Sequence, residues 1–228
     1  MKIRAVVFDF GGVVIRTPFE MVAGLERRLG LVPGTIGLTG PFDPQADPLW
    51  QRFQSGEFTE VGYWHRQADR YADLIDAGED RLRSFMDALF DAPRREVIRP
   101  ETWRLCAVLR SKGLRVAALT NDLGRFHDPA WIERMQVLDK FDPLVDLSHS
   151  GVLKPDPRGY KILLDQLDLP ADRVLFVDDQ PVNIAGAERV GLRTVYFDVP
   201  YPSGSVERVL KTAEALIGEG LGAGHSSP

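Results

Sequence analysis

Several polar side chains interrupt an otherwise apolar sequence, and each comes at or soon after the end of an apolar run. They are Asp9, the pair Thr120-Asn121, Lys154, and the adjacent acids Asp178-Asp179. If these groups meet, the carboxylates and the lysine could bind a divalent cation and a phosphate group, and one carboxylate could act as a nucleophile. Each residue alone has an ordinary explanation as a helix cap, a turn residue or a solvated charge. Their order and shared setting favour a common site.

The stretch before Asp9 predicts the strand that positions it. Residues 5–8 are apolar or small, and Gly11-Gly12 follows. This pattern is typical of a buried strand of a parallel sheet that ends in a tight turn. Ligands of open α/β sheets bind at the carboxyl ends of the strands. Asp9 is therefore a candidate nucleophile or metal ligand, with a cap or turn role as the alternative.

From residue 95 onward, predicted strands alternate with predicted helices. The strands are expected over residues 114–119, 144–147, 174–177 and 194–197. The helices are expected over residues 100–112, 129–141, 157–167, 182–190 and 206–217. Such alternation implies a parallel sheet with right-handed crossovers. The predicted fold class is α/β, a Rossmann-like doubly wound parallel sheet.

Residues 17–94 have a different character. Apolar residues recur at helical spacing, a Gly- and Pro-rich loop covers residues 33–48, and the pattern contains no strand. We therefore expect a small all-helical domain (17–94) inserted after the first strand of a core that comprises 1–16 and 95–217. Its aromatic residues are expected to be mostly core, although a face turned towards Asp9 could touch substrate. The Gly- and Ser-rich tail, residues 218–228, is expected to be disordered.

Composition narrows the class of protein. The chain has 228 residues, 44% of them hydrophobic, with a net charge of −5, which argues against nucleic acid or an anionic membrane as a general partner. Its apolar runs all fall short of the roughly 18 residues of a membrane span. The single cysteine, Cys106, excludes an intrachain disulfide. We expect a soluble cytoplasmic protein whose oligomeric state has no signal in the sequence.

The acidic cluster predicts a bound cation. Three carboxylates within a few ångströms cannot all stay ionised unless positive charge joins them. Lys154 supplies one unit, and Mg²⁺, which prefers carboxylates, a carbonyl and waters, would supply the rest. Because neighbouring side chains diverge near a strand end, one of Asp178 and Asp179 could bind the metal while the other holds a metal-bound water or Lys154.

Four ordered motifs in this chain resemble those of the haloacid dehalogenase-like (HAD) hydrolase superfamily. They are Phe8-Asp9-Phe10-Gly11-Gly12-Val13, Leu119-Thr120-Asn121, Lys154-Pro155-Asp156-Pro157, and the stretch from Val177 to Ala187 that opens Val177-Asp178-Asp179-Gln180. The helical insert is similar to the cap of subfamily I. The branches that look most alike are the glucose-1-phosphatase-like proteins and the N-terminal phosphatase module of epoxide hydrolases.

The resemblance implies a role for each motif residue. Asp9 would be the nucleophile and a Mg²⁺ ligand. The Gly11 backbone carbonyl and Asp179 would be further ligands, with Asp178 and Asn183 supporting them from behind. Thr120 and Asn121 would hold phosphate oxygens, and Lys154 would bridge the nucleophile and the phosphate. The cap would close over the substrate and exclude water.

One position departs from the pattern of the superfamily's phosphatases, which usually carry a second Asp two residues after the first. Here that position is Gly11. General acid–base help is worth roughly 10²–10⁴-fold in rate. The substrate could therefore have a good leaving group, another group (Asp122, His127, His149, His65 or a water) could substitute, or the protein could be a weak hydrolase or a binding relic.

The expected function is a Mg²⁺-dependent phosphatase that hydrolyses a small phosphorylated metabolite, such as a sugar phosphate, through an aspartyl-phosphate. One alternative is a metal-independent 2-haloacid dehalogenase, against which the Asp178-Asp179 pair argues. The other is a non-catalytic HAD-like binding or regulatory protein, which the glycine at position 11 keeps open. The sequence does not identify the substrate.

Overall fold

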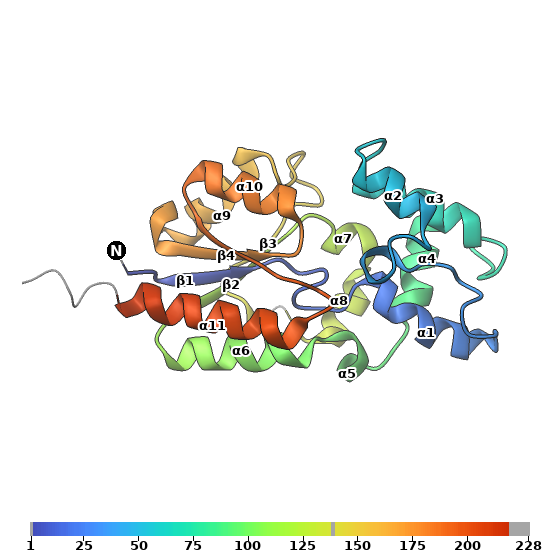
Figure 1. Ribbon diagram of the computed structural model, residues 1–228, viewed down its shortest axis with the longest axis horizontal. Helices are drawn as coiled ribbons and strands as arrows, with labels where there is room; N and C mark the ends of the chain where they lie inside the picture. Colours follow the sequence, from blue (N-terminus) through green and yellow to red (C-terminus); the bar gives the residue numbers. More distant parts are fainter. Residues whose placement is uncertain (1, 138–139, 219–228) are drawn as a thin grey trace, which may run out of the picture.

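A five-stranded parallel sheet in the order β3-β2-β1-β4-β5 forms the centre of the molecule (Figure 1). The computed structural model describes residues 2–137 and 140–218. Its strands are β1 (Ala5–Phe8), β2 (Arg115–Thr120), β3 (Leu144–Asp146), β4 (Val174–Asp178) and β5 (Arg193–Tyr196). The predicted α/β class and parallel sheet are confirmed. Of the tail expected to be disordered, Gly218 ends a helix, and residues 219–228 lie outside the described residues.

Helices cover both faces of this sheet, which explains why its central strand, β1, is apolar throughout. Helices α6 (Pro100–Ser111) and α11 (Pro202–Gly218) lie on one face, and α9 (Pro157–Leu167) and α10 (Pro181–Val190) on the other (Figure 1). Val6 and Phe8 of β1 pack in the cluster that includes α6 and α11, whereas Ala5 and Val7 pack in the cluster with α9 and α10. Alternate residues of a strand point to opposite faces, so all four are buried.

The connection after β2 differs from its prediction. The helix expected over residues 129–141 is shorter: after the short α7 (Leu123–Phe126), α8 spans Pro129–Met135. Helix α8 stops because Gln136 adopts a left-handed conformation with φ of 51° and donates its N–H to the carbonyl of Glu133. The short α5 (Arg94–Val97) and the 3₁₀ turn η3 (Ala171–Arg173) complete the core.

The segment between β1 and α5 is a helical cap. Its elements are α1 (Pro18–Leu29), the 3₁₀ turn η1 (Gly40–Phe42), α2 (Pro48–Gln54), α3 (Glu60–Tyr71) and α4 (Arg81–Phe90). Figure 1 shows the cap beyond the carboxyl ends of the strands. Helix α1 begins with a capping box in which Thr17 and Glu20 bond reciprocally, and Thr59 caps α3. The sequence pattern missed α2, which follows the predicted loop. The domain boundaries at residues 17 and 94 remain our proposal.

Aromatic side chains form the interior of the cap. The ring of Phe19 lies 5.1 Å from that of Trp50 and 5.1 Å from that of Trp64, and Tyr63 contacts Trp64 edge-on at 4.8 Å. The Tyr63 hydroxyl donates to Asp47, which also accepts the backbone N–H of Trp50 at the start of α2. The expected core role of the cap aromatics therefore holds for this cluster. No described helix combines the length and the apolar character needed to cross a membrane.

A buried arginine ties the cap to the core. Arg99 is 2% exposed, its Nε donates to the carbonyl of Gly12 at 3.0 Å, and its Nη2 lies 2.6 Å from the carboxylate of Glu20. Gly12 follows β1, Glu20 belongs to α1, and Arg99 precedes α6. One guanidinium thus joins the chain entering the cap with the chain leaving it.

Candidate active site

Asp9 and the Asp178-Asp179 pair meet because β1 and β4 are neighbours. Phe8 is paired with Val177 in the parallel register, and the backbone N–H of Asp9 donates to the carbonyl of Val177 at 2.8 Å. The chain order moves outward from β1 to β2 and β3 on one side and then returns to β4 on the other. The point between β1 and β4 is therefore the topological switch point, where open α/β sheets bind their ligands.

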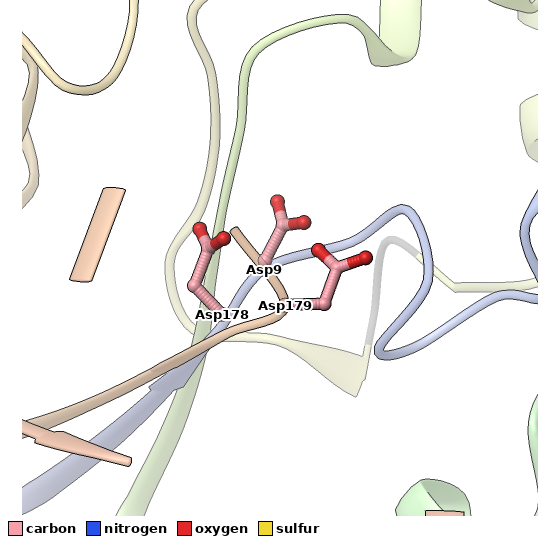
Figure 2. Close-up of side chains that lie close together, drawn as sticks. All are labelled: Asp9, Asp178 and Asp179. Atoms are coloured by element: carbon pink, nitrogen blue, oxygen red, sulfur yellow. The ribbon is translucent and has the colours of Figure 1, made fainter. Parts of the chain in front are cut away.

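The three carboxylates form one cluster that contains a lysine. Asp9, Asp178 and Asp179 each offer an oxygen within 4.8 Å of the others, and Figure 2 shows their carboxylates rising on the same side of the chain. Lys154 reaches the cluster from the loop after β3, with its Nζ 2.6 Å from Asp9 and 2.8 Å from Asp178. The structure thus brings together residues that are up to 170 positions apart in the sequence.

The adjacent acids have different surroundings. Asp178 is fully buried and accepts hydrogen bonds from Lys154, from the side-chain amide of Asn183 and from the backbone N–H of Gln180. Asp179 has no hydrogen bond or ion pair to its carboxylate within residues 2–137 and 140–218. Asp178 therefore holds the lysine, and Asp179 keeps both oxygens free for a ligand.

Gly12 makes the position of Asp179 possible. Gly12 has a φ of +77°, and a Cβ built on it would lie 2.5 Å from Oδ2 of Asp179. Any other residue would therefore both strain the backbone and push the carboxylate away. The second glycine of the motif is needed for this close approach.

The charges of the cluster are unbalanced. Burial raises the pKa of Asp9 to about 7 against the opposing effect of Lys154, and burial together with Asp9 and Asp178 raises the pKa of Asp179 well above its ordinary value. Burial alone would lower the pKa of Lys154, but the carboxylates of Asp178 and Asp9 raise it overall, so the lysine stays charged. One ammonium faces three clustered carboxylates, of which those of Asp9 and Asp178 are buried and that of Asp179 is half-buried. The excess negative charge favours the binding of another cation.

The donor set fits a hard divalent cation. The free carboxylate of Asp179 and the carboxylate of Asp9 are the oxygen ligands that Mg²⁺ prefers, and Gly11 lines the same cavity. Asn183 and Lys154 hold Asp178 in place behind them.

Thr120 is the last residue of β2, on the other side of β1 from β4, and Asn121 follows it. Both line the cavity above Asp9. The side-chain amide of Asn121, however, makes two bonds with the main chain of Lys154: it accepts the N–H at 2.8 Å and donates to the carbonyl at 3.1 Å. The side chain predicted to hold phosphate is thus engaged in positioning the lysine loop. Thr120 keeps its hydroxyl close to the cavity and accepts the N–H of Asp122 at 3.4 Å.

A cavity of about 110 Å³ lies between the core cluster and the cap. That is room for several water molecules or the reacting end of a small substrate. Its floor contains Asp9, Lys154 and Asp179, and its cap wall is mostly aromatic. The aromatic and proline residues that the cap contributes to the wall are Pro18, Phe19, Pro41, Trp50, Trp64 and Phe90. Trp50 and Trp64 therefore serve both the cap interior and the cavity.

The proposed substitutes for the missing acid differ in position. Asp122 and His127 line the cavity, whereas His65 and His149 are not among the described residues that line it. Burial lowers the pKa of His127 to about 3, and its ring stacks on Trp131 at 3.6 Å, so this imidazole is neutral at pH 7.

Sequence reasoning missed Glu60, which enters the cavity from the first turn of α3. An acid just after the N-cap Thr59 is an ordinary feature of helix starts, so nothing in the sequence set this glutamate apart. The lack of a side chain at Gly11 was the signal that another group could take the place of the missing acid.

The comparisons with known proteins agree with the fold and the motifs. The family model of haloacid dehalogenase-like hydrolases matches residues 3–191, and the chain belongs to this family of hydrolases. Mouse acyl-CoA dehydrogenase family member 10 is 30% identical over 94% of this chain, which spans only 19% of that protein. A phosphoglycolate phosphatase from Rhodospirillum rubrum is 31% identical over 87% of this chain and 80% of its own length.

Solved structures share the fold at lower identity. A Bacillus subtilis protein assigned as a HAD-hydrolase, solved bound to magnesium, superposes with a TM-score of 0.67 at 14% identity, covering 93% of this chain and 99% of its own. The L-2-haloacid dehalogenase RSc1362 gives a TM-score of 0.62 at 21% identity over 94% and 100% of the two chains. This chain is thus similar in sequence to relatives that are named phosphatases, and similar in fold to solved structures that are named dehalogenases.

Proposed function

We propose that this hydrolase is a Mg²⁺-dependent phosphatase of small phosphorylated molecules. The observation that carries the proposal is the different bonding of the adjacent acids. Asp178 is bound to Lys154, whereas Asp179 is free beside Asp9. A nucleophilic carboxylate, a fixed ammonium and a free ligand oxygen are the parts that phosphoryl transfer needs. The relatives named as phosphatases support the same class.

The chemistry assigned to the chain's residues has two steps. A carboxylate oxygen of Asp9 attacks phosphorus, the bond from phosphorus to the ester oxygen breaks, and the leaving oxygen takes a proton. A water then attacks the phosphorus of the aspartyl-phosphate, the bond to Asp9 breaks, and inorganic phosphate leaves. Lys154 holds the carboxylate in place and balances the charge of the phosphate oxygens, while the hydroxyl of Thr120 donates to them.

Asp9, Asp179 and the backbone carbonyl of Gly11 would hold the magnesium ion, with Asp178 and Asn183 behind them. The ion, when bound, would neutralise charge on the phosphate. Lys154 alone is not enough for this, because its single positive charge already faces three carboxylates. The aromatic cap wall excludes water around the ester.

The test is release of phosphate or halide by the purified protein. Substrates are p-nitrophenyl phosphate, sugar 1-phosphates, phosphoglycolate and phosphoserine, with 2-haloacids in parallel, each with Mg²⁺ and with EDTA. We expect Mg²⁺-dependent phosphate release that Asp9→Asn abolishes without unfolding the protein. Asp165→Asn, a change at an exposed acid of α9, is the matched control and should retain the rate.

Other outcomes would reject the proposal. Halide release that is insensitive to EDTA would identify a dehalogenase. Silence with every substrate would identify a binding protein. Beryllium fluoride with Mg²⁺ provides a structural check, since it should form an adduct on Asp9, and a crystal without ion or adduct would contradict the aspartyl-phosphate.

A further inference from the structure

The floor of the cavity lacks an acidic side chain at position 11, where the phosphatases of the family usually carry a second aspartate. Gly11 lines the cavity beside Asp9, and a Cβ built on it would meet no atom within 4 Å. The backbone there is compatible with an ordinary side chain, because its φ is not in the left-handed region. The space for an acid is therefore present, but the core contributes none to it.

The cap contributes a carboxyl group to the same cavity. Glu60, the first residue of α3, lines the cavity together with Asp9 and Gly11. Its backbone is anchored, because Thr59 caps the helix through the N–H of Gly62 at 3.2 Å. Three residues earlier, Glu57 is exposed and forms an ion pair with Arg52. The two glutamates thus differ: Glu57 is paired in solvent, whereas Glu60 is half-buried at the cavity.

The surroundings of Glu60 favour the protonated form. Burial raises the pKa of its carboxyl to about 8, and the charges of Asp122 and Asp9 add to the effect, while Trp64 and Lys154 oppose it. The ionisable groups that face this cavity are Asp9, Arg16, Asp122, His127, Lys154 and Asp179. Burial, the largest cause, acts on this carboxyl separately from the charges of the cavity floor.

The other groups in the cavity are poorer donors. Lys154 is held between two carboxylates, which keep its proton in place. His127 is neutral and stacked on Trp131. Burial raises the pKa of Asp122 as well, although Arg125, 3.7 Å away, opposes the shift, and this acid belongs to the core rather than to the cap. Glu60 is the carboxyl group that the cap contributes to the cavity, and it carries a proton near neutral pH.

We propose that Glu60 is the general acid of this enzyme, supplied by the cap in place of the residue missing at position 11. The assignment rests on the proposed phosphatase function. As the bond from phosphorus to the ester oxygen breaks, the electron pair stays on that oxygen and the Glu60 proton moves to it, which yields a neutral alcohol and a Glu60 carboxylate. In the second step the carboxylate takes a proton from the attacking water, and the acid is restored.

The test compares leaving groups that need a proton with leaving groups that do not. Glu60→Gln should lower kcat/KM for alkyl phosphates by about 10²-fold or more and leave kcat/KM for p-nitrophenyl phosphate within about threefold, because kcat/KM reports the step in which the ester bond breaks. Glu57→Gln, in the connection before α3, is the matched control and should change neither. An equal loss with both substrates would reduce Glu60 to a structural role and overturn the proposal.

A rescue experiment uses the open space at Gly11. In the Glu60→Gln background, Gly11→Asp should restore alkyl phosphatase activity by about tenfold or more, since it returns a carboxyl to the cavity floor. If Asp122→Asn shows the leaving-group-dependent loss and Glu60→Gln does not, the proton comes from Asp122 and the proposal fails. The Mg²⁺-dependent activity of the unaltered protein with p-nitrophenyl phosphate reports separately on the proposed function.

Titration of the free protein supplies a readout other than activity. Carbon-13 NMR of protein labelled at the glutamate carboxyls should show one resonance that titrates well above the others and disappears in Glu60→Gln. In the kinetics, kcat/KM for alkyl phosphates should fall as the pH rises through that midpoint, and kcat/KM for aryl phosphates should not. Titration of Glu60 together with the exposed glutamates would overturn the proposal.

Discussion

The side-chain amide of Asn121 holds the main chain of Lys154 by two hydrogen bonds, of 2.8 and 3.1 Å. Asn121 follows β2, and Lys154 lies in the loop after β3, so this contact sets how far the lysine reaches over the sheet edge. The lysine then meets Asp9 and Asp178. The position of the lysine ammonium therefore depends on an amide that bonds the main chain of Lys154.

Removal of this amide should displace the lysine. Asn121→Ala loses two hydrogen bonds, which should cost about 1–3 kcal/mol in the free energy of unfolding, and kcat should fall by about 10²-fold because the ammonium is misplaced. Urea unfolding and steady-state kinetics measure the two effects. Gln51→Ala, which removes an exposed amide of the cap, is the control. Full activity of Asn121→Ala would show that the lysine needs no such support.

The two adjacent glycines should respond differently to the same change. Gly12→Ala places a Cβ 2.5 Å from Oδ2 of Asp179 at a φ of +77°, whereas Gly11→Ala meets no atom within 4 Å. We expect Gly12→Ala to cost about 1–2 kcal/mol of stability from the left-handed backbone alone and to weaken Mg²⁺ binding measured by calorimetry. Gly11→Ala should retain both properties. Equal Mg²⁺ affinity in the two variants would argue against Asp179 as a ligand.

Arg99 should be critical for the junction of core and cap. Its guanidinium is buried and bonds Glu20 and the carbonyl of Gly12. Arg99→Met would leave the carboxylate of Glu20, which is 13% exposed, with Thr17 and, at 3.9 Å, Arg16 as its partners among the described residues. Breaking a buried pair in this way costs about 3–5 kcal/mol. Arg81→Met removes an exposed pair with Asp69 and should cost less than about 1 kcal/mol. Denaturant titration of both variants would check the contrast, and similar losses would contradict it.

Buried His127 should make the protein less stable in mild acid. Burial lowers its folded-state pKa to about 3, below the ordinary 6.5, so only the unfolded chain takes up a proton between these values. Stability therefore falls as pH drops below about 6.5, by about 1.5–2 kcal/mol between pH 6.5 and pH 5.

The test of this histidine is a comparison of pH profiles. His127→Phe keeps an aromatic ring beside Trp131 and Phe90 and should flatten the dependence of unfolding free energy on pH in this window. His65→Gln, at an exposed position of α3, controls for the loss of an imidazole. An unchanged slope in His127→Phe would show that other groups cause the acid sensitivity.

Local patterns were enough to predict the sheet and its polar strand ends. The apolar runs before Asp9, Thr120 and Asp178 were each bounded by turn residues, and a parallel sheet places such ends on one edge. The helix after Pro129 was predicted too long. It ends at a left-handed residue, Gln136, and glutamine is not a residue type that predicts this conformation. Helix α2 was missed because its seven residues are too few to show a period.

The sequence alone determined the fold class, the family motifs and the set of polar residues that could do chemistry, because these depend on residue type and spacing along the chain. Only the tertiary structure decided which of these residues bond one another and which stay free. That Asp178 binds Lys154 while Asp179 stays free, that Asn121 holds a loop, and that Glu60 of the cap shares a cavity with Asp9 all depend on distances between segments far apart in the chain. Burial and charge act through those distances, so they become visible only after the chain has folded.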